Sequence, residues 1–98
     1  MHKKVNEIVC VLKELQKEIK IGFEAEIVGV FGSYAREEQK EGSDVDILVR
    51  FFEGASLFDF VGLANFLEEK LRLKVDIVPV DTVREEIRED VLKEAIYL

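Results

Sequence analysis

Three short apolar stretches decide the fold: EIVGVFGS at residues 26–33, DVDILVR at 44–50 and KVDIVPV at 74–80. Each stretch is rich in β-branched residues and short for a helix, which is typical of buried strands. Pro79 places a break or a sheet edge near the end of the third stretch. We therefore predict a strand in each stretch, the first ending at Phe31, and leave their order in the sheet open.

The segments around these strands show helical spacing. Apolar residues recur every three or four positions over residues 4–20, and again in the segment that ends near Leu71. Ser56 and Asp59 resemble a capping box at the start of that second segment. Polar helix formers favour a further short helix before Gly42. We predict helices over residues 4–20, 34–40, 56–71 and 84–98.

The predicted elements alternate as helix, strand, short helix, strand, helix, strand and helix. This order indicates a small α/β or α+β domain, in which helices pack on a sheet of at least three strands. The chain has 98 residues, of which 48% are hydrophobic, so a packed core is expected. A chain of this length predicts one domain over residues 1–98.

The charge balance is acidic, with 14 Lys and Arg against 21 Asp and Glu and a formal net charge of -7. A broad basic surface for duplex nucleic acid is therefore absent, and we predict no direct nucleic-acid partner. An acidic protein can still bind a polyanion where metal ions or backbone N–H groups face it.

One cysteine, Cys10, excludes an intramolecular disulfide and fits a reducing compartment. It falls among apolar residues of a predicted helix, which favours buried packing over a reactive thiol. The N-terminal residues do not read as a signal peptide, and no apolar run reaches the length that spans a bilayer. We predict a cytoplasmic protein without membrane contact.

Gly32 and Ser33 follow the first predicted strand and precede the short predicted helix. Glycine lets a ligand approach the backbone closely, and free N–H groups at a helix start favour an anion. The Ser33 hydroxyl can add a hydrogen bond to a phosphate oxygen. The pair is therefore a possible phosphate site, although an ordinary turn with a helix cap is the more common meaning of Gly-Ser after a strand.

Asp44 and Asp46 are two residues apart, so in a strand both carboxylates point to the same face. Two close carboxylates are costly without a cation, and Mg²⁺ prefers such oxygen ligands together with phosphates. Asp76 lies inside an otherwise apolar strand, where a carboxylate is costly unless it is exposed, paired or bound to metal. If the two strands are neighbours, three carboxylates converge beside a phosphate site, as in two-metal phosphoryl transfer.

These motifs together resemble the minimal nucleotidyltransferases of the DNA polymerase beta superfamily. The family pattern of Gly-Ser, a short helix, Asp-x-Asp and a later strand Asp appears as Gly32-Ser33, then Asp44-Val45-Asp46 after ten residues, and Asp76. The segments GSYAR at 32–36 and SDVDILV at 43–49 most resemble the corresponding segments of the MNT antitoxins that are paired with HEPN toxins. The resemblance covers about residues 26–80.

The resemblance implies an enzyme that transfers AMP from ATP to a tyrosine of a HEPN ribonuclease toxin. Gly32 and Ser33 would hold the triphosphate, and Asp44 and Asp46 would hold two Mg²⁺ ions. Asp76 would complete the metal site and help to activate the tyrosine hydroxyl. The three carboxylates are thus the expected catalytic and metal-binding residues.

Two residues near the Gly-Ser pair are less clearly assigned. Arg36 is a weaker phosphate-binding candidate, since a salt bridge to one of the nearby Glu residues is an equally good interpretation of the sequence. Glu37 departs from the family pattern, because many relatives carry Gly after the Arg. A negative charge there is slightly unfavourable near phosphates.

Two other functions stay open at this point. One is neutralisation of a toxin by contact alone, with a vestigial site, and the other is transfer of a nucleotide to a small molecule. The second alternative is less expected, because the chain leaves little room for an acceptor pocket. Nucleic-acid polymerisation ranks lowest, since there is no basic channel.

Overall fold

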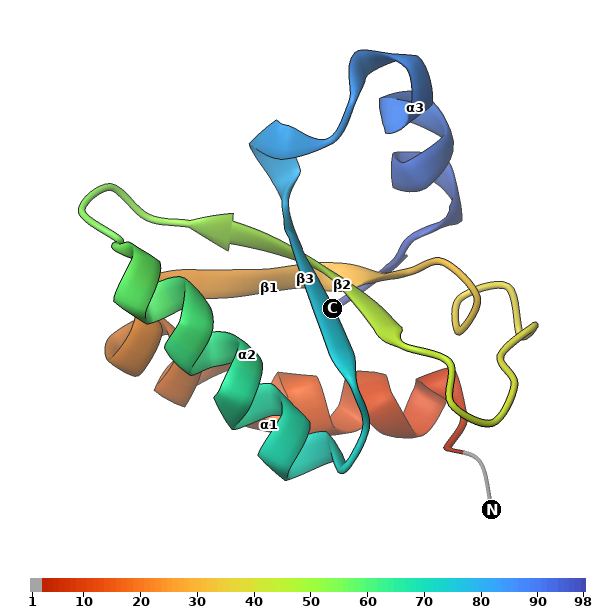
Figure 1. The fold of residues 1–98 in the computed structure, drawn as a ribbon, viewed down its shortest axis with the longest axis horizontal. Helices are drawn as coiled ribbons and strands as arrows, with labels where there is room; N and C mark the ends of the chain where they lie inside the picture. Colours follow the sequence, from red (N-terminus) through yellow and green to blue (C-terminus); the bar gives the residue numbers. More distant parts are fainter. Residues whose placement is uncertain (1–2) are drawn as a thin grey trace.

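The computed structural model describes residues 3–98 and forms one mixed sheet with helices on it (Figure 1). The elements in chain order are α1 (Val5–Phe23), β1 (Ala25–Phe31), β2 (Val45–Phe51), α2 (Leu57–Leu71), β3 (Val75–Pro79), the 3-10 turn η1 (Val80–Thr82), α3 (Glu85–Glu94) and β4 (Ile96–Tyr97). The three predicted strands and the two long predicted helices are confirmed, with ends that shift by at most three residues.

The strands lie in the order β3-β2-β1-β4. Antiparallel pairs join β1 to β2 and β1 to β4, whereas β2 and β3 run parallel. The parallel pair requires a crossover connection, and α2 provides it. The fold is therefore α+β, as the sequence predicts.

The core lies between the sheet and the two long helices, which share one side of the strands in Figure 1. Val45, Ile47 and Val49 of β2 are fully buried there, against apolar residues of α1 and α2 that include Ile8, Leu12, Leu63 and Leu67. Alternation along β2 then directs Asp46, Leu48 and Arg50 to the opposite face.

The predicted capping box at the start of α2 is present. The Ser56 hydroxyl accepts a hydrogen bond from the Asp59 backbone N–H at 3.4 Å, and the Asp59 carboxylate accepts one from the Ser56 N–H at 2.9 Å. Two free N–H groups of the first turn are thus satisfied locally. This fixes the point at which the crossover from β2 to β3 begins.

Two predicted helices are wrong in whole or in part. Residues 34–37 form turns and residues 38–40 have no regular structure, because Glu37 adopts a left-handed conformation with φ 59° that does not continue a helix. The last helix ends at Glu94 instead of reaching Leu98, because Ile96 and Tyr97 pair with the edge of β1 as β4.

The expectation for Cys10 is also wrong, since its side chain is exposed. The buried residues of α1 include Ile8 and Leu12, four positions apart on one face of the helix. Cys10 lies two positions from each of them and so belongs to the opposite face. Within residues 3–98, no helix is both long enough and apolar enough to cross a bilayer.

The third helix lies on the side of the sheet that α1 and α2 leave open. Figure 1 shows α3 beyond the strands, away from the two long helices. Of the residues of α3, Val91 is the one that is buried. The open face of the sheet, with α3 beside it, is where the polar strand residues point.

Candidate active site

Asp46 and Asp76 are brought together by the parallel pairing of β2 and β3. They are direct register partners on strands that lie about 5 Å apart. Both side chains belong to the sheet face opposite the core, since their neighbours Ile47 and Ile77 are buried in it. The condition on which the sequence prediction depended, that the two strands are neighbours, is met.

Gly32 lies directly against Asp46. It follows the last residue of β1, Phe31, which pairs with Asp46 on β2. The backbone of Gly32 has φ +75°, and a Cβ atom added there would lie 2.1 Å from the Asp46 Oδ2 atom. Only glycine fits this position without moving the carboxylate. The loop after β1 and the carboxylate of β2 therefore share one small space.

The loop after β1 is a run of tight turns. The Arg36 N–H donates to the Gly32 carbonyl at 3.1 Å, and the Glu38 N–H donates to the Ser33 carbonyl at 2.8 Å. Tyr34 anchors the loop, since only 2% of its surface is exposed and it belongs to the hydrophobic core. Because no helix begins at Ser33, the predicted helix dipole does not act there, and any anion site depends on turn N–H groups.

Asp44 lies just before β2 and is exposed. Its charge nevertheless acts on the site. Burial, as the largest cause, and the negative charges of Asp76, Asp44 and Glu94 together raise the pKa of Asp46 to about 6, whereas Arg36 opposes the shift. Such a pKa is typical of a carboxylate that is placed among like charges and would be relieved by a cation.

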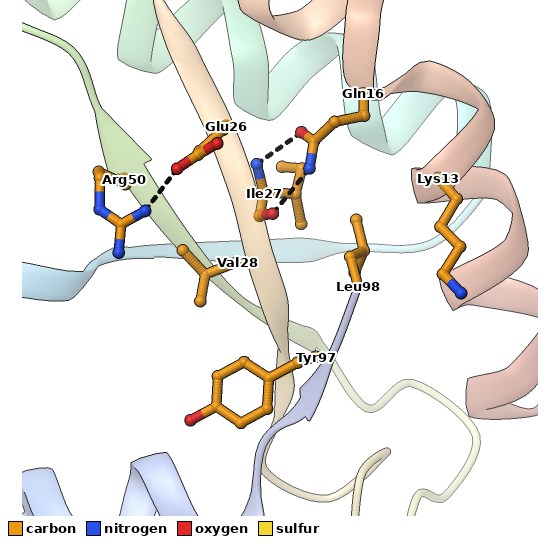
Figure 2. A pocket seen from close by; sticks show the side chains of 8 residues that line it. All are labelled: Lys13, Gln16, Glu26, Ile27, Val28, Arg50, Tyr97 and Leu98. Carbon is orange, nitrogen blue, oxygen red and sulfur yellow. Dashed lines mark hydrogen bonds and ion pairs between the residues drawn. The ribbon is translucent and has the colours of Figure 1, made fainter.

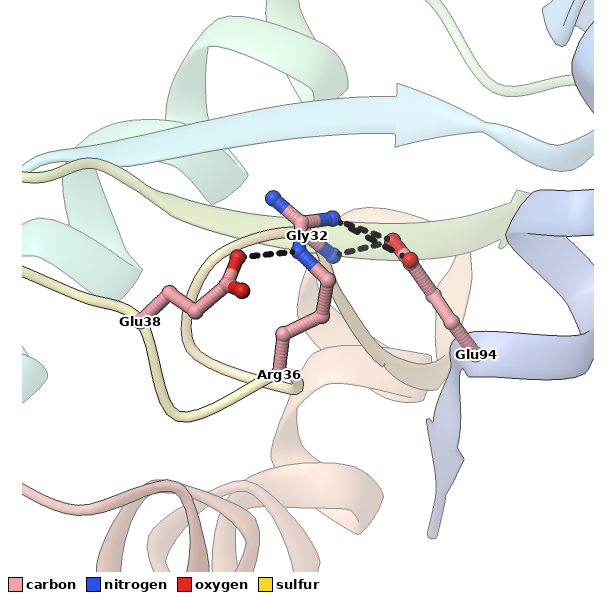
Figure 3. Close-up of polar contacts among 4 residues, drawn as sticks. All are labelled: Gly32, Arg36, Glu38 and Glu94. Carbon is pink, nitrogen blue, oxygen red and sulfur yellow. Dashed lines mark hydrogen bonds and ion pairs between the residues drawn. The ribbon is translucent and has the colours of Figure 1, made fainter.

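Arg36 and Glu94 form the polar contact next to Gly32 (Figure 3). The Arg36 Nη1 atom donates to Glu94 Oε2 at 3.1 Å, and its Nε atom donates to Glu38 Oε1 at 2.8 Å. Glu94 also accepts the Gly32 N–H at 2.8 Å. The salt bridge that the sequence offered as the alternative role of Arg36 is thus present.

A pocket of about 260 Å³ opens beside the two paired carboxylates. The sheet contributes Phe31, Asp46, Asp76 and Val78, and the segment from η1 to α3 contributes Thr82, Val83, Arg84, Ile87 and Val91. The pocket therefore combines two carboxylates and one guanidinium group with mostly apolar walls. Such a mixture fits an organic ligand whose polar group reacts at the carboxylates.

The paired carboxylates of Asp46 and Asp76 suit a magnesium ion that also binds phosphate. Within residues 3–98, no three Asp, Glu, His or Cys side chains are arranged as a complete metal site. Mg²⁺, however, is commonly held by one or two carboxylates together with substrate phosphates. The Asp46 and Asp76 pair supplies those two carboxylates, and the absence of a side chain at Gly32 leaves room for the Asp46 carboxylate.

A larger pocket of about 490 Å³ lies elsewhere, at the outer edge of β1 (Figure 2). Its charged groups are largely occupied by one another, since Arg50 is paired with Glu26. The Gln16 side chain exchanges two hydrogen bonds of 2.8 Å with the Ile27 backbone and so completes the strand edge beyond β4. None of the three expected catalytic carboxylates lines this pocket, and it is not the candidate site.

Three residues near the site have no counterpart in the sequence prediction. Tyr34 anchors the loop, Arg84 lines the pocket, and Glu94 contacts Gly32. Glu94 is one of many acidic residues, so only the pairing of β4 with β1 singles it out. Tyr34 lies within the GSYAR segment. An aromatic ring next to the end of a buried strand was the sequence feature that could have predicted its burial.

Comparisons with known proteins bear on the fold of the whole chain. A family model described as a nucleotidyltransferase domain matches residues 5–98. The protein adenylyltransferase MntA of Thermococcus cleftensis is 44% identical over 94 residues, which cover 96% of this chain and 95% of that protein. A solved structure provisionally described as a minimal nucleotidyltransferase matches with TM-score 0.82 and 38% identity, over 99% of this chain and 98% of the other.

A more distant solved structure is a toxin-antitoxin crystal structure with AMP-PNP. It matches with TM-score 0.67 and 22% identity, over 97% of this chain and 72% of the other, so this likeness concerns the fold alone. Together the comparisons confirm the small nucleotidyltransferase fold that the sequence motifs predict.

Proposed function

This chain belongs to the nucleotidyltransferase domain family, and from that premise we propose that it transfers AMP from ATP to a tyrosine of a HEPN toxin. The observation that carries the proposal is the close contact of Gly32, the first residue of the loop after β1, with the carboxylate of Asp46, which is paired with Asp76 on the next strand. The name of its relative MntA, a protein adenylyltransferase, supports a protein as the acceptor.

The loop after β1 would bind the triphosphate. Gly32 and Ser33 would face the phosphates, because glycine leaves room for them and the Ser33 hydroxyl can donate a hydrogen bond. Arg36 would pair with a phosphate oxygen, a contact for which its guanidinium group is suited. The buried ring of Tyr34 would keep the loop in place while ATP binds and pyrophosphate leaves.

The carboxylates would hold two Mg²⁺ ions, with Asp46 and Asp76 as paired ligands and Asp44 at the strand entrance. Bound Mg²⁺ supplies charge stabilisation for the attacking and leaving oxygens of an in-line displacement. Asp76 would accept the proton of the acceptor hydroxyl. The hydroxyl oxygen then attacks the α-phosphorus, and pyrophosphate leaves.

The acceptor would enter the pocket between the sheet and α3. Its apolar walls, which include Phe31, Val83 and Ile87, suit an aromatic ring, and its carboxylates suit a phenol hydroxyl. A tyrosine side chain combines both groups. We place the reaction in the cytoplasm, which supplies ATP and would contain the toxin.

Neutralisation by contact alone is the second candidate, and one observation favours it. Leu57 and Phe58, in the first turn of α2, are 76% and 89% exposed. Exposed apolar side chains of this kind favour a protein interface. A bound partner would then be silenced without transfer of AMP.

The ribonuclease activity of the toxin separates the two candidates. The toxin would be incubated with this protein and Mg²⁺, with or without ATP, then freed from it before RNA cleavage is measured. The proposal expects lasting inhibition only with ATP, and none after incubation with the Asp44→Asn/Asp46→Asn variant. Equal inhibition by the variant, lost when the complex is separated, would instead establish neutralisation by contact.

A further inference from the structure

The Glu94 carboxylate occupies the hydrogen-bond donors of Gly32 and Arg36, which are the groups that would bind phosphate. Glu94 Oε1 accepts the Gly32 N–H at 2.8 Å, and the Arg36 Nη1 atom lies 3.2 Å from Oε1 and 3.1 Å from Oε2 (Figure 3). A carboxylate and a phosphate use the same partners, since both accept N–H groups and paired guanidinium bonds.

The position of Glu94 follows from the pairing of β4 with β1. Val30 is opposite Ile96, and Gly29 is opposite Tyr97. Glu94 is the last residue of α3, two positions before Ile96, so this pairing brings the end of α3 beside Gly32, which lies two positions after Val30. The contact is thus set by the backbone of the sheet.

We propose that Glu94 occupies the phosphate position of the loop at Gly32 and Arg36 in the free protein, so that a nucleoside triphosphate must displace its side chain in order to bind. This inference rests on the proposed function, because it concerns the same nucleotide site. It assigns Glu94 an inhibitory role in nucleotide binding.

The contact has the features of a reversible one. The Glu94 side chain is 28% exposed, and an ion pair at the surface contributes little to stability. The side chain can therefore rotate toward solvent while β4 stays paired. Once it does, the Gly32 N–H and Arg36 are both free for phosphate, and a negative charge has left the neighbourhood of Asp46.

Calorimetric titration with a non-hydrolysable ATP analogue and Mg²⁺ tests the inference. Glu94→Gln is expected to bind about tenfold more tightly than the wild type, because the competing charge is removed. Glu94→Ala is the second variant, since a Gln side chain still offers an acceptor to Gly32. Circular dichroism would show that both variants are folded.

Glu89→Gln is the matched control. It removes the same charge from the same helix, at an exposed residue that pairs with Lys93. Its affinity should stay within about twofold of the wild type. Inorganic triphosphate is the second probe, and the Glu94 variants should bind it more tightly by the same factor, because the competition concerns phosphate and not the base.

The outcomes separate this inference from the function on which it rests. If wild type and Glu94 variants bind the analogue equally, the nucleotide site stands and the inhibitory role is wrong. Weaker binding by the variants would also overturn it and would make Glu94 a residue that positions Arg36. If neither the wild type nor any variant binds, the proposed function fails, and this inference fails with it.

Discussion

The contact between Gly32 and Asp46 packs the backbone of the loop after β1 directly against a carboxylate of β2. Its effect can be separated from backbone strain, because Gly42 also has a positive φ, of +86°, but has open space around it. In either position Ala costs about 1 kcal/mol of strain. Only at Gly32 must a carboxylate move.

We therefore predict that Gly42→Ala lowers the free energy of unfolding by about 1 kcal/mol, and that Gly32→Ala lowers it by at least as much because the Asp46 carboxylate must also move. Gly32→Ala should also lower AMP transfer by about a hundredfold, because the Asp46 carboxylate is displaced. Urea unfolding and transfer assays on both variants provide the check. Full activity of Gly32→Ala would contradict the placement of Asp46.

The raised pKa of Asp46 predicts a cost in stability. Since its folded pKa is about 6 and the ordinary value is about 4, the folded state holds the proton more tightly between these two values. The free energy of unfolding therefore falls as the pH rises through this window, and the full penalty remains above about pH 6.

Asp46→Asn should remove that penalty. We predict that at about pH 7.5 the variant is more stable than the wild type by about 1–2 kcal/mol, after allowance for solvent screening, and that it no longer transfers AMP. The difference should shrink toward zero near pH 4. Denaturant unfolding at the two pH values tests this, and a variant that is less stable at the higher pH would contradict it.

The three carboxylates and the Gly-Ser pair could be proposed from the sequence, because they lie within or beside short apolar strands and together match a family pattern. Glu94 could not be proposed in the same way. Its contact with Gly32 depends on the register of a strand of two residues, which leaves no periodicity to detect.

The short strand β4 connects the end of α3 to the site. Gly29 allows this, because a Cβ atom there would lie 2.6 Å from the Ile96 backbone carbonyl oxygen. Backbone atoms of a paired strand cannot yield as a flexible side chain can. The approach of β4 to β1 thus depends on one glycine.

Gly29→Ala is predicted to detach β4 and to lower the free energy of unfolding by about 1–3 kcal/mol. Hydrogen exchange of the Leu98 amide, which donates to the Val28 carbonyl at 3.1 Å, should become faster. Gly22→Ala is the control, since it lies in α1 with no atom near its added Cβ. It should leave this exchange unchanged. Protection of Leu98 in Gly29→Ala would show that β4 stays in place.

The long elements were predictable because their periodicity extends over many residues, and the capping box marked the start of α2. The turns at residues 34–37 were not, since polar helix formers gave no sign that Glu37 would be left-handed. Cys10 is exposed because it lies on the outer face of the helix. The prediction of burial was wrong because it was based on the apolar residues next to Cys10 in the sequence and not on its face of the helix.

Nucleotide binding should stabilise the folded state of the protein, because the unfolded chain has no site. A Mg²⁺-loaded ATP analogue at about 100 times its dissociation constant is predicted to add about 2.7 kcal/mol to the free energy of unfolding. For a domain of this size this raises the melting temperature by roughly 10–20 °C. Thermal denaturation measures the shift.

The Asp44→Asn/Asp46→Asn variant should lose most of this shift, and so should the wild type in the presence of a metal chelator. A shift that survives both changes would place the nucleotide away from the carboxylates.

The most direct test of the proposed function follows the phosphate of ATP that reaches the toxin. The protein, Mg²⁺ and a HEPN toxin would be incubated with ATP labelled at the α-phosphate or, separately, at the γ-phosphate. We predict that wild type places the α-label, and not the γ-label, on a toxin tyrosine, and that Asp44→Asn/Asp46→Asn places none. A stable complex without α-label, or equal labelling by the variant, would contradict a carboxylate-dependent transfer of AMP.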